Sequence, residues 1–109
     1  MKPTRFYSNK QEKQVAKHVG GRQVSNSGAT AFNKGDVTTD KFLIECKTKT
    51  TESKSFSIKK EWLEKNKEEA FSMGKMRSAL AFNFGPDEPN YYVIDSITFR
   101  ELIRLLEED

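Results

Sequence analysis

The stretch GDVTTDKFLIECKTKT, residues 35–50, combines the most apolar strand of the chain with closely spaced charges. Residues 42–44, Phe-Leu-Ile, predict a buried β-strand, and Glu45 and Lys47 follow at spacing i, i+2. Successive strand side chains point to opposite faces, so Glu45 and Lys47 point the same way and Cys46 points the other way. An acid and a base therefore lie side by side at the end of a strand that should be central in a sheet.

The remaining elements follow from hydrophobic periodicity, capping signals and turn residues. Ser57 is expected to cap one helix, and capping-box patterns start others at Ser8 and Thr98. Helices are expected over residues 8–19, from residue 57 to near Gly74, and from residue 98 onward. Strands are expected over residues 22–25, 36–38, 42–49, 79–84 and 91–94, with a loop over 25–35. This order predicts an α/β fold, a mixed central sheet flanked by helices on both faces.

Length and composition indicate one domain, residues 1–109, of the soluble globular class. The chain is 35% hydrophobic and 32% charged. No apolar run approaches the roughly 20 residues needed to span a bilayer, and the N-terminus lacks the apolar core of a signal peptide. The single cysteine, Cys46, cannot form an internal disulfide. These features favour an intracellular protein with no membrane partner.

The net charge alone says little about partners, but the positions of the charged residues are compatible with a phosphate-bearing partner. The formal net charge is only +3, but lysines crowd the middle of the chain and the C-terminal LLEED is acidic. A basic centre can follow a phosphate backbone through counterion release. The alternative is a solvated surface with many Glu–Lys pairs.

A second acid, Asp36, begins the neighbouring strand of the same hairpin. Two carboxylates that converge across a hairpin suit a hard divalent cation, and the backbone carbonyl of Cys46 can supply another oxygen. Lys47 beside such a site can hold a water or neutralise charge developing on a phosphate. Together Asp36, Glu45 and Lys47 predict a metal-dependent phosphodiesterase. The alternative is a surface hairpin with a cross-strand ion pair worth under about 1 kcal/mol.

Two further acids have alternative interpretations. Glu12 shares the inward face of the first predicted helix with Val15, so it can reach the same metal site. Glu12 also stands three residues after Asn9, which is the spacing of a capping box. Asp40 is the other candidate for the role of Asp36, but its place at the predicted hairpin turn favours a turn residue.

A phosphate-binding surface is expected around the start of the second helix. Backbone N–H groups at a helix start, with hydroxyls and lysines nearby, bind phosphate oxygens. The alternative is an ordinary N-cap followed by solvated lysines. The residues expected to contact DNA are Arg22, Ser27, Lys34, Lys49, Ser55, Ser57, Lys59 and Lys60.

Five motifs spread over most of the chain belong together: Glu12 in the first helix, SGA at residues 27–29, KGDV at 34–37, IECKT at 44–48 and SFSIKKEWL at 55–63. With these motifs the chain resembles the PD-(D/E)xK nuclease superfamily, and within it the small Holliday junction resolvases of the archaeal and phage type. The proline of the family signature is Gly35 here, so Gly-Asp replaces Pro-Asp.

The resemblance implies a restriction-endonuclease-like core and a homodimer that cuts branched DNA, such as four-way junctions, during recombination and repair. It implies Mg²⁺ as cofactor, with Mn²⁺ as a substitute, and a prokaryotic or phage origin. Asp36, Glu45 and Lys47 would be the catalytic signature. Glu12 would be the acid that the family places on its first helix.

Two other functions are compatible with the sequence. The same core serves nicking, restriction or repair endonucleases, and only the preferred DNA structure separates these from a resolvase. A non-catalytic basic domain that binds nucleic acid is the second alternative. It predicts that Glu45→Ala and Lys47→Ala leave every activity intact.

Overall fold

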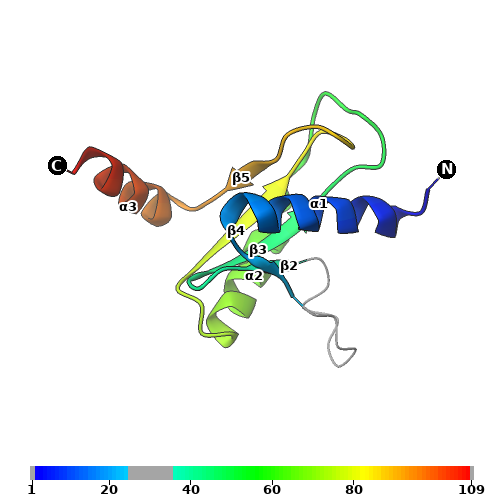
Figure 1. Cartoon of the computed structure of the whole chain (residues 1–109). Coiled ribbons are helices and arrows are strands. Elements are labelled where there is room, and N and C mark those ends of the chain that lie inside the picture. Colours follow the sequence, from blue (N-terminus) through cyan, green and yellow to red (C-terminus); the bar gives the residue numbers. More distant parts are fainter. Residues whose placement is uncertain (1, 25–35, 109) are drawn as a thin grey trace.

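The computed structural model describes residues 2–24 and 36–108 and shows a five-stranded mixed sheet accompanied by three helices (Figure 1). The predicted α/β class and mixed sheet are confirmed. The helices are α1 (Thr4–Val19), α2 (Lys60–Ser72) and α3 (Ser96–Glu107). The strands are β1 (Arg22–Gln23), β2 (Asp36–Thr38), β3 (Phe42–Lys47), β4 (Arg77–Phe82) and β5 (Tyr91–Val93).

The strands lie in the sheet in chain order, β1-β2-β3-β4-β5. Neighbouring strands are antiparallel except β3 and β4, which are parallel and are joined by the crossover helix α2. β3 is therefore the central strand, as its run of apolar residues predicts.

Alternation along the strands divides the core into two layers. On one face Val37 and Ile44 pack with Val15 of α1. On the other face, which α2 covers, Leu43 and Leu80 are fully buried. The helices α1 and α2 thus cover opposite faces of the sheet, which confirms the expected layer arrangement.

Helix α1 begins four residues before the expected start, so the predicted capping box at Ser8 is wrong. Pro3 occupies the N-cap position without a side-chain hydrogen bond. The Ser8 hydroxyl bonds instead to the carbonyl of Thr4 within the helix, at 3.3 Å. Proline at a helix start loses no intrahelical hydrogen bond, because the first N–H groups have no partner in any case.

Helix α2 begins three residues after Ser57, so the predicted Ser57 cap is also wrong. Lys59 is the N-cap residue, with extended backbone and no side-chain cap. Phe56 packs against Phe82 and Trp62, with ring centroids 5.0 and 6.4 Å apart. These aromatic contacts hold the preceding residues in an extended path over the sheet.

Four strands differ from expectation at their boundaries. β1 ends at Gln23 rather than residue 25, and β5 ends at Val93 rather than residue 94. β3 ends at Lys47 rather than residue 49, because the Thr48 hydroxyl turns to Asn83 Oδ1 at 2.7 Å. β4 spans residues 77–82 rather than 79–84, and its start is fixed by the hydrogen bond from the Arg77 N–H to the Lys41 carbonyl, at 2.9 Å.

Helix α3 starts at Ser96, and its N-cap is Asp95 rather than Thr98. The Asp95 carboxylate accepts a hydrogen bond from the Thr98 N–H at 2.8 Å. The helix projects from the end of the sheet, on the side away from the N-terminus (Figure 1). No helix in the described part of the chain is long and apolar enough to cross a membrane.

Candidate metal and phosphate site

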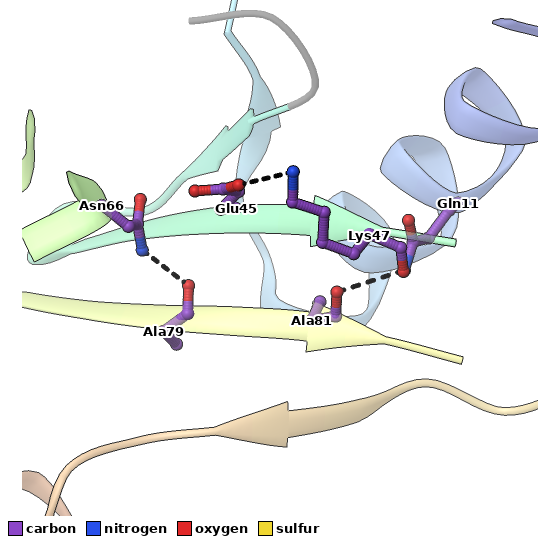
Figure 2. A network of polar contacts seen from close by, with 6 residues as sticks. All are labelled: Gln11, Glu45, Lys47, Asn66, Ala79 and Ala81. Carbon is purple, nitrogen blue, oxygen red and sulfur yellow. Dashed lines mark hydrogen bonds and ion pairs between the residues drawn. The ribbon is translucent and has the colours of Figure 1, made fainter. Parts of the chain in front are cut away.

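The β2–β3 hairpin brings three predicted site residues to one face of the sheet. Asp36 and Glu45 are direct partners in the antiparallel register. Lys47, two residues along β3, places its Nζ 3.0 Å from Glu45 Oε2 (Figure 2). The same Nζ lies 4.5 Å from the ring centroid of Trp62 on α2. The prediction that Glu45 and Lys47 point the same way is confirmed.

Asp36 is the most perturbed acid of this group. It is 2% exposed, and its Oδ2 atom has no hydrogen-bond partner among the described residues. Burial raises its pKa to about 8, and the nearby carboxylates of Glu69, Glu45 and Glu12 add to the rise. Lys47 opposes the shift without cancelling it. Acidic groups therefore outnumber the one lysine, Lys47, in this group, and the raised pKa keeps Asp36 mostly protonated at neutral pH.

Glu12 lies in the middle of α1, on the opposite side of the sheet from Asp36, Glu45 and Lys47. Because α1 begins at Thr4, the capping interpretation of Glu12 is excluded. Its Oε1 accepts a hydrogen bond from Gln23 Nε2 at 3.2 Å, and its buried Oε2 has no partner among residues 2–24 and 36–108. Glu12 is close enough to raise the pKa of Asp36, so the two acids share one electrostatic environment.

Gln11 fixes the strand ends that carry the site. This residue is 1% exposed, and its Nε2 donates to the Lys47 carbonyl at 2.7 Å and to Asn90 Oδ1 at 3.1 Å. A longer contact of 3.4 Å reaches the Ala81 carbonyl of β4 (Figure 2). Since the backbone of Lys47 is held in this way, its side chain leaves the sheet from a rigid position.

The donor set fits a hard divalent cation in part. Among the described residues no three Asp, Glu, His or Cys side chains converge to hold a metal ion. Mg²⁺, however, is usually bound by one or two carboxylates and keeps several waters. Asp36, with its partnerless buried oxygen, and Glu45 meet that requirement, and the Cys46 carbonyl lies between Glu45 and Lys47 on β3.

The thiol of Cys46 faces away from Asp36, Glu45 and Lys47. Its side chain belongs to the layer under α1, where it packs against the cluster of Val15 and Ile44. Burial, with Glu12 and Asp36 nearby, raises the pKa of the thiol well above its usual range. The sulfur therefore stays protonated and does not act as a nucleophile.

Of the lysines and serines before α2 that were expected to contact DNA, some are bonded within the loop and others are exposed. Lys49 is engaged within the loop, since its Nζ donates to the Ser55 carbonyl at 2.6 Å and to Ser53 Oγ at 3.0 Å. Ser57 is exposed and caps nothing. Lys59, also exposed, places its Nζ 5.6 Å from the centroid of the Trp62 ring, which Lys47 also approaches.

No side chain caps the first N–H groups of helix α2. Lys47 and Lys59, which both approach Trp62, lie near this helix start. Its first residue, Lys60, is exposed. An uncapped helix start with adjacent cations attracts anions. The start of α2 is thus chemically suited to a phosphate.

Other predicted DNA contacts lie away from the hairpin site or outside the described residues. Arg22 is exposed and pairs with Thr38, toward the hairpin turn and away from Lys47. It borders a separate hollow with Asp40 and Lys75. Ser27 and Lys34, with the SGA motif, lie outside the described residues.

Two residues near the site were not predicted. Glu69 raises the pKa of Asp36 from α2 and stands seven residues after Trp62, on the same helical face. Arg5 lines an open groove of about 410 Å³ with Ser8, Glu12 and Lys47. The spacing of Arg5, Ser8 and Glu12 is a helical signal, but the expected helix start at residue 8 left Arg5 outside the helix.

Comparison with known proteins finds no family model, no curated protein and no solved structure that matches the chain. The resemblance to PD-(D/E)xK nucleases therefore stays a prediction from the motifs.

Proposed function

We propose that the protein is a Mg²⁺-dependent endodeoxyribonuclease that cuts branched DNA, acting as a homodimeric junction resolvase. One observation carries the proposal. The buried carboxylate of Asp36, with one oxygen partnerless among the described residues, lies directly across the hairpin from the Glu45–Lys47 ion pair. An excess of acids around one lysine is unfavourable in the chain alone and becomes favourable when a divalent cation binds.

Each residue of the site has a distinct task in this proposal. Asp36, Glu45 and the Cys46 carbonyl would hold the cation, which supplies Lewis acidity and an activated water when bound. Glu45 keeps the Lys47 ammonium at 3.0 Å, and the Trp62 ring lies against the same ammonium. Lys47 is thereby held to orient the attacking water and to offset charge on the scissile phosphate. Glu12 adds negative field from the opposite side of the sheet.

The surroundings supply contacts for the rest of the DNA backbone. The uncapped start of α2, with Lys59 and Lys60, offers donors to a phosphate next to the hairpin. On the other side, Arg5 borders the groove that also contains Lys47. A duplex arm that follows these cations would pass over Lys47, so its backbone would lie at the proposed catalytic residues.

The proposal is tested with a labelled synthetic four-way junction, incubated with Mg²⁺ beside a linear duplex of the same arm sequence. Paired cuts in the junction alone are the expected result. Cuts in both substrates would retain the site but assign the protein to another class of endonuclease. Binding without any cut would favour the non-catalytic DNA-binding alternative.

Exchange of the metal gives a sharper control on the same site. Ca²⁺ takes more oxygen ligands in a looser geometry than Mg²⁺. We therefore expect the junction to bind in Ca²⁺ without being cut, and cutting to begin when Mg²⁺ is added. Efficient cleavage in EDTA would contradict the metal-dependent mechanism.

A further inference from the structure

The most exposed apolar surface of the described chain is on α3. Six of its large apolar side chains are exposed, whereas the other described residues together expose five, on several elements. The exposed fractions on α3 reach 57% for Phe99, 67% for Leu105 and 82% for Leu106. Monomeric soluble proteins rarely expose contiguous apolar patches larger than a few hundred Å², and larger patches mark interaction sites.

Four of the six exposed apolar residues of α3 form one continuous stripe. Phe99, Leu102, Ile103 and Leu106 follow the spacing i, i+3, i+4, i+7, which places them on one side of the helix. The remaining surface carries Arg100, Glu101, Arg104 and Glu107, with two further apolar residues, Ile97 and Leu105, outside the stripe. This pattern is typical of a helix that packs its stripe against another helix.

Polar contacts at the base of α3 hold the stripe away from the rest of its own chain. Asp95 caps the helix and is paired with Lys67 of α2 at 3.0 Å. Glu101 is paired with Arg77 of β4 at 2.6 Å, and Thr98 is the only residue of α3 that is buried. Beyond this base the helix extends into solvent (Figure 1). Folding α3 back over its own sheet would break these contacts.

We infer that the stripe on α3 is covered by α3 of a second copy of this chain, in antiparallel orientation across a two-fold axis. In that arrangement Phe99 of one copy meets Leu106 of the other, and Leu102 meets Ile103. Each apolar residue of the stripe then has an apolar partner, and the same surface serves both copies, as an isologous interface requires.

The charges beside the stripe favour a second copy of α3 as the partner, and they favour the antiparallel orientation. Arg100 and Glu107 lie on the same flank, near opposite ends of the helix, so antiparallel pairing brings each to the other in the second copy. Charges next to an apolar seam set the orientation of helix pairs. Antiparallel helices also oppose their dipoles favourably.

The charge balance of α3 disfavours other occupants. Its two arginines are outnumbered by Glu101, Glu107 and Glu108. A helix that binds an anionic membrane carries basic residues around its apolar face, and a nucleic-acid partner also requires positive charge. A helix of the same sequence satisfies both the stripe and the mixed charges. The inference assigns an interface to the homodimer of the proposed function and rests on that part of it; it concerns association only, and its test does not depend on whether the protein cuts DNA.

The first test is the mass of the full-length protein in solution, by sedimentation equilibrium over a range of concentrations. We expect the wild type to reach the mass of two 12.5 kDa chains. Leu102→Arg places a charge in the seam and should raise the dimer dissociation constant by about 100-fold or more. Phe6→Arg is the matched control, because Phe6 is also 41% exposed but lies on α1.

Two outcomes would overturn the inference. One is a wild type that stays monomeric at its highest soluble concentration. The other is equal association of Leu102→Arg and Phe6→Arg. Circular dichroism of each variant shows whether it is folded, and substitution of an exposed residue should leave the spectrum unchanged. DNA cleavage is measured separately, so failure of the dimer and failure of the nuclease are distinguishable.

A cross-linking test examines the antiparallel direction. The variants Phe99→Cys and Leu106→Cys are mixed and oxidised, the native Cys46 being partly buried under α1. Antiparallel pairing predicts a disulfide that joins one chain of each variant. Faster linking of Leu106→Cys to itself would indicate parallel helices and would overturn the proposed arrangement.

Discussion

The β2–β3 hairpin and helix α3 depart from ordinary burial in opposite ways. At the hairpin, an ionisable group is buried in a central sheet, with Asp36 only 2% exposed. On α3, apolar groups are in solvent, with Leu106 82% exposed. Buried charge and exposed apolar surface are both unfavourable in an isolated chain. Among the described residues, the acids near Asp36 outnumber the one lysine, Lys47, and the apolar stripe of α3 is exposed, so each region indicates a different kind of missing partner.

The two regions also differ in how firmly they are attached. The hairpin is part of the sheet, is paired on both sides and is held by Gln11. Helix α3 is attached at one end through polar contacts. Substitutions at the hairpin should therefore change chemistry and stability, whereas substitutions on α3 should mainly change association.

The largest effect is expected at the hairpin, from Glu45→Gln. This change removes a proposed ligand charge and the partner of Lys47, so junction cleavage should fall by about 1,000-fold while binding persists. The cleavage rate and a gel-shift assay on the same junction measure the two quantities. Glu68→Gln, an exposed change on α2, is the control. Unchanged cleavage by Glu45→Gln would show that the hairpin is not the catalytic site.

The second largest effect is expected on the free energy of unfolding, where a substitution in the sheet core should cost more than one on α3. Leu80→Ala removes a fully buried side chain and should lower the free energy of unfolding by about 3 kcal/mol. Leu105→Ala, at 67% exposure, should lower it by under about 0.5 kcal/mol in dilute protein. Urea unfolding at a concentration where the protein is monomeric gives both values. Equal losses would mean that α3 packs against its own chain.

The third expected effect follows from the pKa of Asp36. Its folded-state pKa, raised from 3.8 to about 8, means that the folded protein binds this proton more tightly than the unfolded chain. Without divalent cations, stability should therefore fall as the pH rises from about 4 to about 8. Asp36→Asn should remove this dependence and stabilise the protein at the upper end, by about 1.4 kcal/mol for each unit by which the pKa of Asp36 is raised.

Urea unfolding in EDTA at pH values near the two ends of this range measures the Asp36 effect. Added Mg²⁺ should then stabilise the wild type more than Asp36→Asn, because a bound ligand adds to the free energy of unfolding. Equal stabilisation of the two proteins would exclude Asp36 as a ligand.

The smallest effect is expected at the base of α3. Asp95→Ala removes the N-cap and should weaken the protection of α3 amides by about 1 kcal/mol. The hydrogen bond from the Thr98 N–H, with Lys67 nearby, lowers the pKa of Asp95 to about 2. The capping contribution is therefore present above about pH 4 and is lost as the pH falls toward 2.

Hydrogen exchange across this pH range tests the Asp95 prediction, and Glu52→Ala serves as a control on a distant exposed acid. A wild-type protection that did not change with acid would show that the Asp95 cap contributes nothing to α3.

Local sequence signals predicted the existence and the type of each helix and strand better than they predicted its boundaries. The apolar stripe that includes Val15 was sufficient to predict helix α1, and the apolar run of β3 was sufficient to predict that strand. Each signal is a local spacing of apolar residues and needs no distant contact. The starts of all three helices were misplaced, since each of Ser8, Ser57 and Thr98 has a capping pattern that a neighbouring residue or contact replaced. Such competition is decided by packing, as the contact of Phe56 with Phe82 illustrates.

The sequence by itself determined the α/β class, the paired β2–β3 hairpin and the common face of Glu45 and Lys47, because strand alternation is a property of the backbone. Only the tertiary structure decided that Asp36 is buried without a partner for one oxygen among the described residues, that Glu12 comes from the opposite side of the sheet, and that α3 stands away from the core. Burial and the charge near a group depend on elements distant in sequence. No local pattern contains that information.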